Sequence, residues 1–332
     1  MSATSSRRQF VASLGAFAAY SAAASSYGFP MSAQSSSPQR LPFPFRVSVI
    51  TDEISQDFAH ACEIAANEFG MFWVELRGLW NKNILSLDAK EIAEALRILD
   101  KFHLRVTDIA SPLFKVDWPG APKSKFSSTG AQFNADFNFD QQGEVLDRSI
   151  ALAKSFSTDR VRCFDFWRLD NPAPYRAAIN QKLLEAAKKA GAQGIVLLLE
   201  NEPACNTATG AEAAQVLAAI QSPHLLLNWD PGNAATLGEH PFPDGYNLLP
   251  KDRIGHCHCK DAVKKPDGSG YDWAPVGRGS IDWVGQFRAL QRDGYHLAVS
   301  LETHWRGAAT PEDSTRQSWA GMKAALQEAA KT

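Results

Sequence analysis

Four residues of the kinds that bind metal ions or carry protons stand at or beside the ends of four apolar segments. They are Glu200 in IVLLLEN, Asp230 in LLLNWDPGN, His258 in IGHCHCKD and Glu302 in AVSLETH. A charged group at the exit of a buried strand needs a partner, because an unpaired charge is costly to bury. Three carboxylates and one imidazole that meet at one point would form a site for a hard divalent cation. Oxygen-rich ligation of this kind suits Mn²⁺, Mg²⁺ or Co²⁺ better than structural zinc.

An ion pair with a nearby Arg or Lys is the alternative interpretation for each of these acids taken alone. Four such groups at four successive strand ends favour the metal site, because separate ion pairs do not require that regular placement.

The elements that must position these residues alternate along the chain. Short apolar segments with turn signals around them predict buried parallel strands, and amphipathic helical segments lie between them. The predicted strands are Val47–Thr51, Phe72–Leu76, Leu104–Ile109, Arg160–Phe164, Ile195–Glu200, Leu225–Trp229, Ile254–Cys259 and Ala298–Glu302. The predicted helices are Glu91–Phe102, Glu144–Phe156, Ala177–Ala190, Glu212–Ile220, Ile281–Arg292 and Glu312–Ala330.

This alternation predicts an α/β fold, a (β/α)8 TIM barrel over residues 45–332. A doubly wound open sheet is the alternative, but the first strand is not followed by the Gly-rich phosphate turn typical of that fold. In a barrel the C-terminal strand ends form one ring, so the last four strands would bring the four candidate ligands together. The long segments 111–142 and 262–280 follow the third and seventh strands, and we expect them to border the substrate.

The composition is that of an ordinary globular protein. The chain has 332 residues, of which 45% are hydrophobic and 21% charged, and its net charge is −2. Nothing in this balance indicates a nucleic-acid partner. No uncharged segment beyond the N-terminus is long enough to span a membrane. Barrels of this class often pair, so a homo-oligomer is an expectation for which the sequence shows no interface.

The N-terminal region has the features of an export signal. Arg7 and Arg8 precede a weakly apolar, Ala-rich stretch that ends in small residues, which resembles a twin-arginine (Tat) signal peptide over residues 1–33. Cleavage after Ala24 or after Ala33 is equally compatible with the sequence. Residues 34–44 have the composition of a linker. The Tat machinery is therefore an expected partner and the periplasm the expected location.

The five cysteines do not form a recognisable disulfide or zinc pattern. Cys257 and Cys259 alternate with His256 and His258 on one predicted strand. If the histidines point into the barrel, the cysteines point to the helix layer, where they act as small buried thiols.

The chain resembles the xylose isomerase-like barrel superfamily, and within it the sugar (phosphate) isomerases and epimerases. The resemblance spans roughly residues 46–330. It is carried by the order Glu, Asp, His in H-x-H-x-K-D, then Glu, and by the segments VELRGL, NWDPGNA, HCHCKDA and VGRGSIDW. It implies that Glu200, Asp230, His258 and Glu302 bind one divalent metal ion, and that Glu200 and Glu302 act as the acid–base pair.

The implied chemistry is proton transfer between carbons next to a carbonyl, through an enediolate that the metal stabilises as a Lewis acid. Two positions depart from the ketose 3-epimerases, which place a His three residues after the metal-binding Asp and an Arg six residues after the metal-binding His. Asn233 and Lys264 stand there instead. These departures weaken a specific assignment as a 3-epimerase.

Further residues are candidates for substrate binding. They are Glu75, Arg77, Asn233, Lys260, His304 and Trp118. The alternatives are structural: a Glu75–Arg77 ion pair, a salt bridge from Lys260 to an inward acid, and ordinary packing for Trp118. Asp52 and Glu53, which follow the first strand, could contact the ligand or cap the next helix, and the cap is the favoured interpretation.

The sequence therefore predicts a metal-dependent sugar isomerase or epimerase that acts on a non-phosphorylated sugar, keto-sugar or polyol. The second hypothesis is a lyase, dehydratase or hydrolase that acts on a 3-keto-glycoside or inosose, because the same metal and bases can eliminate a leaving group β to a carbonyl. A DNA-repair endonuclease is disfavoured by the negative net charge. A sugar-binding protein without catalysis is a further alternative.

Overall fold

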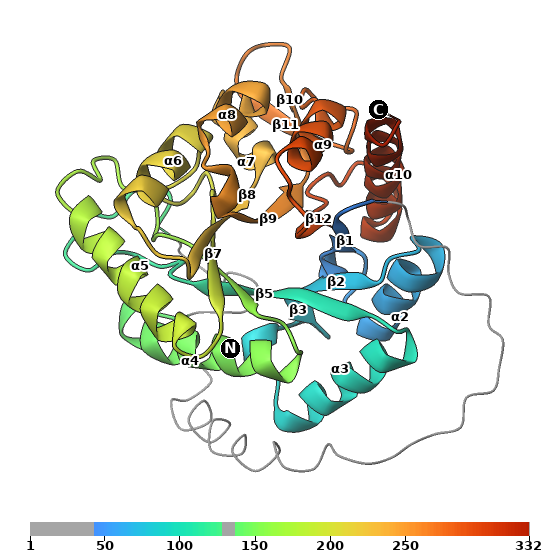
Figure 1. Ribbon diagram of the computed structural model, residues 1–332, viewed down its shortest axis with the longest axis horizontal. Helices are drawn as coiled ribbons and strands as arrows, with labels where there is room; N and C mark the ends of the chain where they lie inside the picture. Colours follow the sequence, from blue (N-terminus) through green and yellow to red (C-terminus); the bar gives the residue numbers. More distant parts are fainter. Residues whose placement is uncertain (1–42, 128–136, 332) are drawn as a thin grey trace.

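The computed structural model describes residues 43–127 and 137–331, and within them eight parallel strands form one sheet. The strands are β1 (Arg46–Val49), β2 (Trp73–Leu76), β5 (Arg105–Leu113), β6 (Arg160–Cys163), β7 (Val196–Glu200), β8 (Leu225–Trp229), β9 (Ile254–Cys259) and β12 (Ala298–Leu301). Their order in the sheet is β1-β12-β9-β8-β7-β6-β5-β2. A parallel bridge between Ile50 and Glu75 joins β1 to β2 and completes the ring. The predicted TIM barrel is confirmed (Figure 1).

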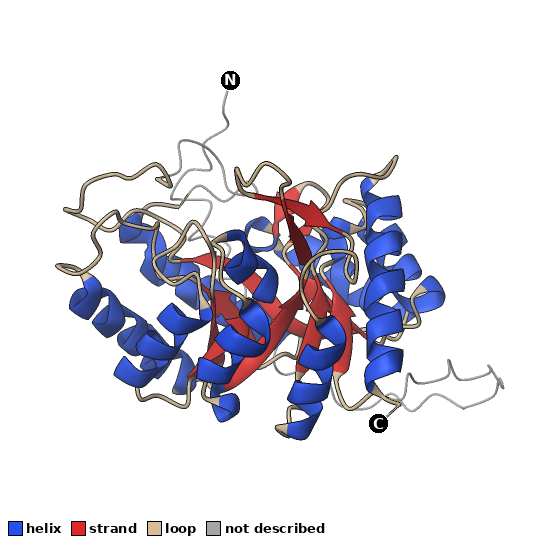
Figure 2. Ribbon diagram, turned by 90° about the horizontal axis from the view of Figure 1, so that it is seen from above, coloured by secondary structure: helices blue, strands red, loops and turns tan. Residues whose placement is uncertain are grey.

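Helices surround the sheet on its outer side (Figures 1 and 2). They are α2 (Phe58–Glu63), α3 (Ala89–Lys101), α4 (Gln142–Ser155), α5 (Arg176–Gly191), α6 (Gly210–Ala219), α7 (Pro231–Thr236), α8 (Tyr246–Leu248), α9 (Trp283–Arg292) and α10 (Pro311–Ala329). Two short hairpins, β3 (Gly78–Leu79) with β4 (Lys82–Asn83) and β10 (Asp261–Lys264) with β11 (Tyr271–Ala274), lie outside the barrel sheet.

The helix starts follow from local chemistry. Asp88 and Glu91 form a capping box at the start of α3, in which each side chain accepts a backbone N–H of the other. Thr310 caps α10, with Pro311 in its first turn. The six predicted helices are present within a few residues of their expected bounds. The short helices α2, α7 and α8 were not predicted, because six or fewer residues give too short a periodic pattern.

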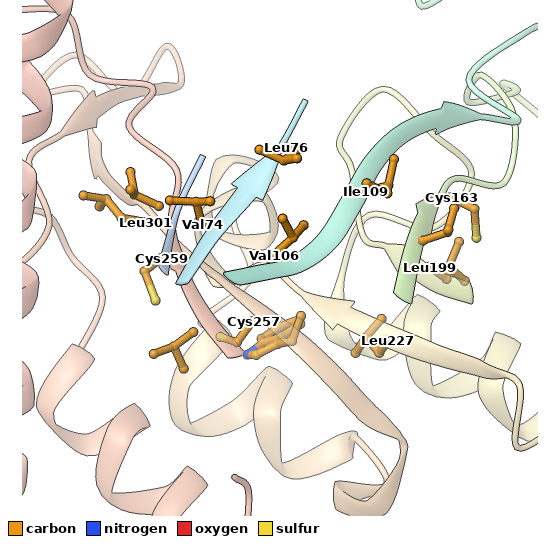
Figure 3. Close-up of a cluster of buried hydrophobic side chains, with 14 of the residues drawn as sticks. Val74, Leu76, Val106, Ile109, Cys163, Leu199, Leu227, Cys257, Cys259 and Leu301 are labelled. Atoms are coloured by element: carbon orange, nitrogen blue, oxygen red, sulfur yellow. The ribbon is translucent and has the colours of Figure 1, made fainter. Parts of the chain in front are cut away.

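The hydrophobic core lies between the strands and the helices. Outward-facing side chains such as Leu199, Leu227 and Leu301 form a continuous buried layer (Figure 3). Cys257 and Cys259 belong to the same layer and are free thiols, as expected from their alternation with the histidines. Burial raises the pKa of the Cys259 thiol well above its ordinary value, which keeps it protonated.

None of the described helices is sufficiently long and apolar to cross a membrane. The predicted signal peptide and nearly all of the predicted linker lie outside the described residues.

Candidate metal and active site

Glu200, Asp230, His258 and Glu302 meet at the C-terminal end of the barrel. One ligand atom from each lies within 4.8 Å of those of the other three. The His258 Nδ1 atom is 3.4 Å from Glu200 Oε1, 3.6 Å from Asp230 Oδ2 and 3.2 Å from Glu302 Oε2. All four side chains are buried. We call these four residues the carboxylate–histidine cluster. The structure thus brings together the four residues that the sequence analysis singled out, and their role as metal ligands stays a prediction.

The D-P-G-N segment fixes Asp230 in place. Asp230 is the N-cap of α7, and its Oδ1 atom accepts the backbone N–H of Asn233 at 2.8 Å. Pro231 follows in the first turn, where a missing N–H has no cost. Asn201 directly follows β7 and makes two hydrogen bonds to the backbone of Asp230. Its Oδ1 atom accepts the Asp230 N–H at 2.7 Å, and its Nδ2 atom donates to the Asp230 carbonyl oxygen at 2.8 Å. The Oδ1 atom of Asp230 therefore caps the helix, and the Oδ2 atom faces the cluster.

Two neighbours hold Glu200 as a carboxylate. Arg162 Nη1 lies 3.2 Å from Glu200 Oε2, and Asn233 Nδ2 donates to Oε1 at 3.2 Å. Burial alone would raise the pKa of Glu200, but the charges of Arg162 and His258 outweigh it and lower the pKa to about 2. Glu200 is therefore ionised at neutral pH.

Glu302 is surrounded by two cationic groups and a histidine. Lys260 Nζ donates to its Oε2 atom at 2.5 Å, and Arg77 Nη1 donates to Oε1 at 3.2 Å. His304 Nε2 lies 3.3 Å from Oε1. Burial works against ionisation, but Lys260, His304 and His258 hold the pKa of Glu302 well below its usual range.

Lys260 also contacts Asp230, with Nζ 2.8 Å from Oδ2, so it bridges two members of the cluster. Its side chain is only 2% exposed, and the Trp273 ring of β11 lies 5.4 Å from the ammonium group. Despite the cost of burying an ammonium group, the charges of Asp230 and Glu302 raise the pKa of Lys260 above its usual value. The salt bridge to an inward acid, which was the structural alternative for Lys260, is therefore present, and its role in substrate binding stays a prediction.

Arg77 lies on the other side of Glu302 and binds three acids. Besides Glu302 it donates to Asp52 at 3.0 Å and to Glu53 at 2.6 Å. This corrects the expectation that Asp52 and Glu53 cap the next helix, since Asp57 caps α2. The alternative Glu75–Arg77 ion pair is not among the described ion pairs of Arg77, and substrate binding by Arg77 stays a prediction.

Glu75 lies below the cluster, inside the barrel. Its Oε1 atom is 3.0 Å from His258 Nε2, and its Oε2 atom is 3.2 Å from His256 Nε2. The side chain has no exposed surface. The structure thus places Glu75 between two histidines inside the barrel, and its predicted role in substrate binding stays a prediction. Burial opposes ionisation of Glu75, but His258 and His256 hold its pKa well below the ordinary value.

The remaining candidates fall in different places. Asn233 supports Glu200, as described above. His304 packs edge-on against Trp273, with ring centroids 4.8 Å apart, and is partly exposed next to Glu302. Trp118 packs against Phe139 and Phe166, with ring centroids 5.6 and 4.8 Å away. Its described contacts are thus aromatic packing.

Sequence reasoning missed Arg162 and Asp108. Arg162 lies on β6 and points to Glu200, and Asp108 lies on β5 with Oδ1 3.7 Å from His256 Nδ1. Burial and the charge of Glu75 raise the pKa of Asp108 to about 6. An ionisable residue inside a predicted buried strand was the available signal in both cases, since such a residue must have a partner.

Two of the sequence motifs form one turn beside the cluster. Asp261, next to Lys260, accepts backbone N–H groups from Gly277, Gly279 and Ile281 at 2.9, 3.1 and 3.3 Å. A Cβ atom on Gly279 would lie 2.0 Å from Asp261 Oδ1, so only glycine fits. The VGRGSI segment therefore wraps around Asp261 and anchors the hairpin that carries Trp273.

The cluster fits a hard divalent cation. Its donor set is three carboxylates and one imidazole. Two of its buried oxygens, Glu200 Oε2 and Asp230 Oδ2, accept no hydrogen bond. Their contacts are ion pairs, of Glu200 Oε2 with Arg162 and of Asp230 Oδ2 with Lys260 and His258. A buried oxygen without a hydrogen-bond donor can bind a cation.

A cavity of about 340 Å³ lies at the opposite end of the barrel. It is lined by the residues that begin β1 and β2 and by Arg105 and His296, and it contains no carboxylate. The carboxylate–histidine cluster lies instead at the C-terminal end, where TIM-barrel enzymes carry their active sites.

Comparison with known proteins agrees with this arrangement. A family model described as "Xylose isomerase-like TIM barrel" matches residues 64–325. A search of curated proteins finds no match. Among solved structures, a probable 3-DHS dehydratase, AsbF, from Bacillus anthracis is 21% identical, with a TM-score of 0.61 over 84% of this chain and 97% of that one.

Two further structures are similar in fold. A D-psicose 3-epimerase with D-tagatose from Clostridium cellulolyticum H10 is 15% identical, with a TM-score of 0.61 over 86% of this chain and 98% of that one. An IOLI protein with a bound zinc atom is 13% identical, with a TM-score of 0.64 over 86% of this chain and 100% of that one. The chain spans only 42% of a longer neighbour, a xylose isomerase-like TIM barrel/4-hydroxyphenylpyruvate dioxygenase fusion protein.

Proposed function

The chain belongs to the xylose isomerase-like TIM barrel family, and we propose that it is a divalent-metal-dependent enzyme that isomerises or epimerises a sugar, keto-sugar or polyol. The observation that carries the proposal is the carboxylate–histidine cluster, in which four ligand groups from successive strand ends lie within 4.8 Å of one another. Glu200, Asp230, His258 and Glu302 would hold the ion, with Mn²⁺, Mg²⁺ or Co²⁺ as candidates. The bound ion would supply Lewis-acid stabilisation of negative charge on a substrate oxygen.

The protein's own groups provide the proton transfer. Glu200 and Glu302 are both ionised, so each is ready to accept a proton. They come from β7 and β12, which β8 and β9 separate in the sheet, so the two carboxylates approach from different sides. One can remove a proton from carbon, and the other can return a proton to carbon after it has itself taken one up from water. Return to the opposite face of the same carbon gives epimerisation, and return to the neighbouring carbon gives isomerisation.

The charges near the cluster favour a substrate without a phosphate. Within the part of the chain that the structure describes, the nearby cations are paired with carboxylates: Arg77 with Glu302, Arg162 with Glu200, Lys260 with Asp230 and Lys115 with Glu202. We further propose export through the Tat pathway to the periplasm, on the basis of Arg7-Arg8 and the stretch that follows. Neutral sugars are the expected substrates there.

A lyase or dehydratase is the second candidate. A dehydratase is among the structural neighbours, and Asn233 replaces the residue expected in a ketose 3-epimerase. The same two bases could remove a proton and assist the loss of a group β to a carbonyl.

A panel of keto-sugars and inososes in D₂O separates the two candidates. Solvent deuterium in a product that keeps all its atoms supports isomerisation or epimerisation, whereas release of water or an aglycone supports elimination. The Glu302→Gln variant should lose turnover while it still binds the ligand. A purified, metal-loaded protein that converts no member of the panel, or a Glu302→Gln variant with full turnover, would contradict the proposal.

A further inference from the structure

A second polar layer lies directly beneath the carboxylate–histidine cluster. It contains Glu75 of β2 and both histidines of β9, and none of these three side chains is exposed. Glu75 Oε1 is 3.0 Å from His258 Nε2, and Glu75 Oε2 is 3.2 Å from both His256 Nε2 and His258 Nε2. The carboxylate thus lies between the two rings, which are nearly perpendicular at 86°.

This contact determines which nitrogen of His258 carries hydrogen. An ionised carboxylate can only accept hydrogen bonds, so the imidazole nitrogen that faces it must be the donor. The Nε2 atom of His258 therefore carries a hydrogen, and Nδ1 is the atom that would offer its lone pair to a metal ion. That atom is the one that faces Glu200, Asp230 and Glu302, at 3.2 to 3.6 Å.

The amide of Asn228 does not change this assignment. Its Nδ2 atom lies 3.1 Å from His258 Nε2 and 3.4 Å from His258 Nδ1. A donor that is nearly equidistant from both ring nitrogens is not aligned with the in-plane lone pair of either one. Glu75 is therefore the stronger partner of Nε2.

We propose that Glu75 is a positioning residue that orients His258 and fixes its tautomer so that Nδ1 points at the metal. This inference rests on the proposed function, in which His258 is a metal ligand. A carboxylate behind a metal-binding histidine also makes the imidazole a better donor, and loss of such a partner typically weakens metal affinity by about 10- to 100-fold. His256 holds the second oxygen of Glu75 and so keeps the carboxylate in place.

The same three side chains satisfy the spacing of a cation site in their own right. The contacts favour positioning, since His258 already directs Nδ1 to the cluster and uses Nε2 for Glu75. Metal stoichiometry separates the two roles: positioning leaves the number of bound ions unchanged when Glu75 is replaced, whereas a ligand role reduces it.

The test is the Glu75→Gln variant, which keeps the shape of the side chain and removes its charge. We expect Mn²⁺ affinity, measured by titration calorimetry, to fall by about 10- to 100-fold with an unchanged number of ions per chain. The visible spectrum of the Co²⁺-loaded protein should shift as well. Asp165→Asn is the matched control, because Asp165 is equally buried but binds Arg176 and Thr207 instead of a histidine. Its Mn²⁺ affinity should equal that of the wild type.

A measurement on the wild type covers the case in which Glu75→Gln does not fold. Nitrogen-15 NMR of the Mg²⁺-loaded protein should show His258 with hydrogen on Nε2 and none on Nδ1. Hydrogen on Nδ1, unchanged Mn²⁺ affinity in Glu75→Gln, or the loss of one ion per chain in that variant would each overturn the positioning role while the proposed function stands. A wild type that binds no divalent metal would overturn both.

Discussion

Replacement of Lys260 by Met tests how the charges of the cluster are balanced. The ammonium group lies 2.8 Å from Asp230 Oδ2 and 2.5 Å from Glu302 Oε2 and is almost fully buried. Removal of one partner from a buried ion pair costs about 3–5 kcal/mol, because the other charge is left uncompensated. Methionine has a similar length and keeps most of the packing, so the loss should be mainly electrostatic.

A cost of this size is easy to measure. One kcal/mol shifts the melting temperature of a large domain by about 2–4 °C, so the Lys260→Met protein in EDTA should melt roughly 6–20 °C below the wild type. A divalent cation supplies positive charge to the same carboxylates. Addition of Mn²⁺ should therefore raise the melting temperature of Lys260→Met by more than that of the wild type.

Lys115→Met is the control for this experiment. Lys115 also pairs with an acid near the mouth, Glu202 at 3.2 Å, but both side chains are partly exposed. Partly exposed pairs contribute about 0–1 kcal/mol, so this variant should melt within a few degrees of the wild type. Equal melting temperatures for Lys260→Met and Lys115→Met in EDTA would refute the reasoning. An equal Mn²⁺ response in Lys260→Met and the wild type would also refute it.

Three further predictions concern other parts of the structure. Gly232→Ala should lower both stability and Mn²⁺ affinity, because the added Cβ would lie 2.5 Å from Lys260 Cγ; normal thermal melting and affinity would count against it. Asp88→Ala should reduce the free energy of unfolding in urea by about 1 kcal/mol through loss of the α3 cap, whereas Asp88→Asn should cost little. Burial raises the pKa of Glu53, but Arg77, His304 and Arg306 lower it below 4.5, the ordinary value of a glutamic acid, so its ionised form stabilises the fold above that pH. This stabilisation should be lost as pH falls below 4.5, and Glu53→Gln should flatten the acid limb of the stability curve; an unchanged limb would contradict the assignment.

The sequence predicted the barrel well because each strand is an apolar run of distinctive length. The positions of charged residues at strand ends also indicated the cluster. Glu200 and Glu302 directly follow apolar residues, and the fold brings successive strand ends together. Helices such as α2 were missed because one or two turns carry no reliable periodicity.

The partners of the cluster were harder to predict. Glu75 lies on β2 and Arg77 directly follows that strand, which suggested a shared role. Arg77 instead contacts Asp52 and Glu53, while Glu75 contacts the histidines. The acid with which a buried cation pairs depends on the register between strands that are far apart in the sequence. A single sequence does not contain that information. Burial of Arg162 and Asp108 inside strands was a legible signal, but their partners were not.

Metal binding by the purified mature protein tests the central claim most directly. Elemental analysis and Mn²⁺ titration should find one divalent ion per chain, and single replacements Glu200→Ala, Asp230→Ala, His258→Ala and Glu302→Ala should each abolish tight binding in a folded protein. A wild type without a bound ion, or four variants that retain the affinity of the wild type, would contradict the claim that these side chains form a metal site.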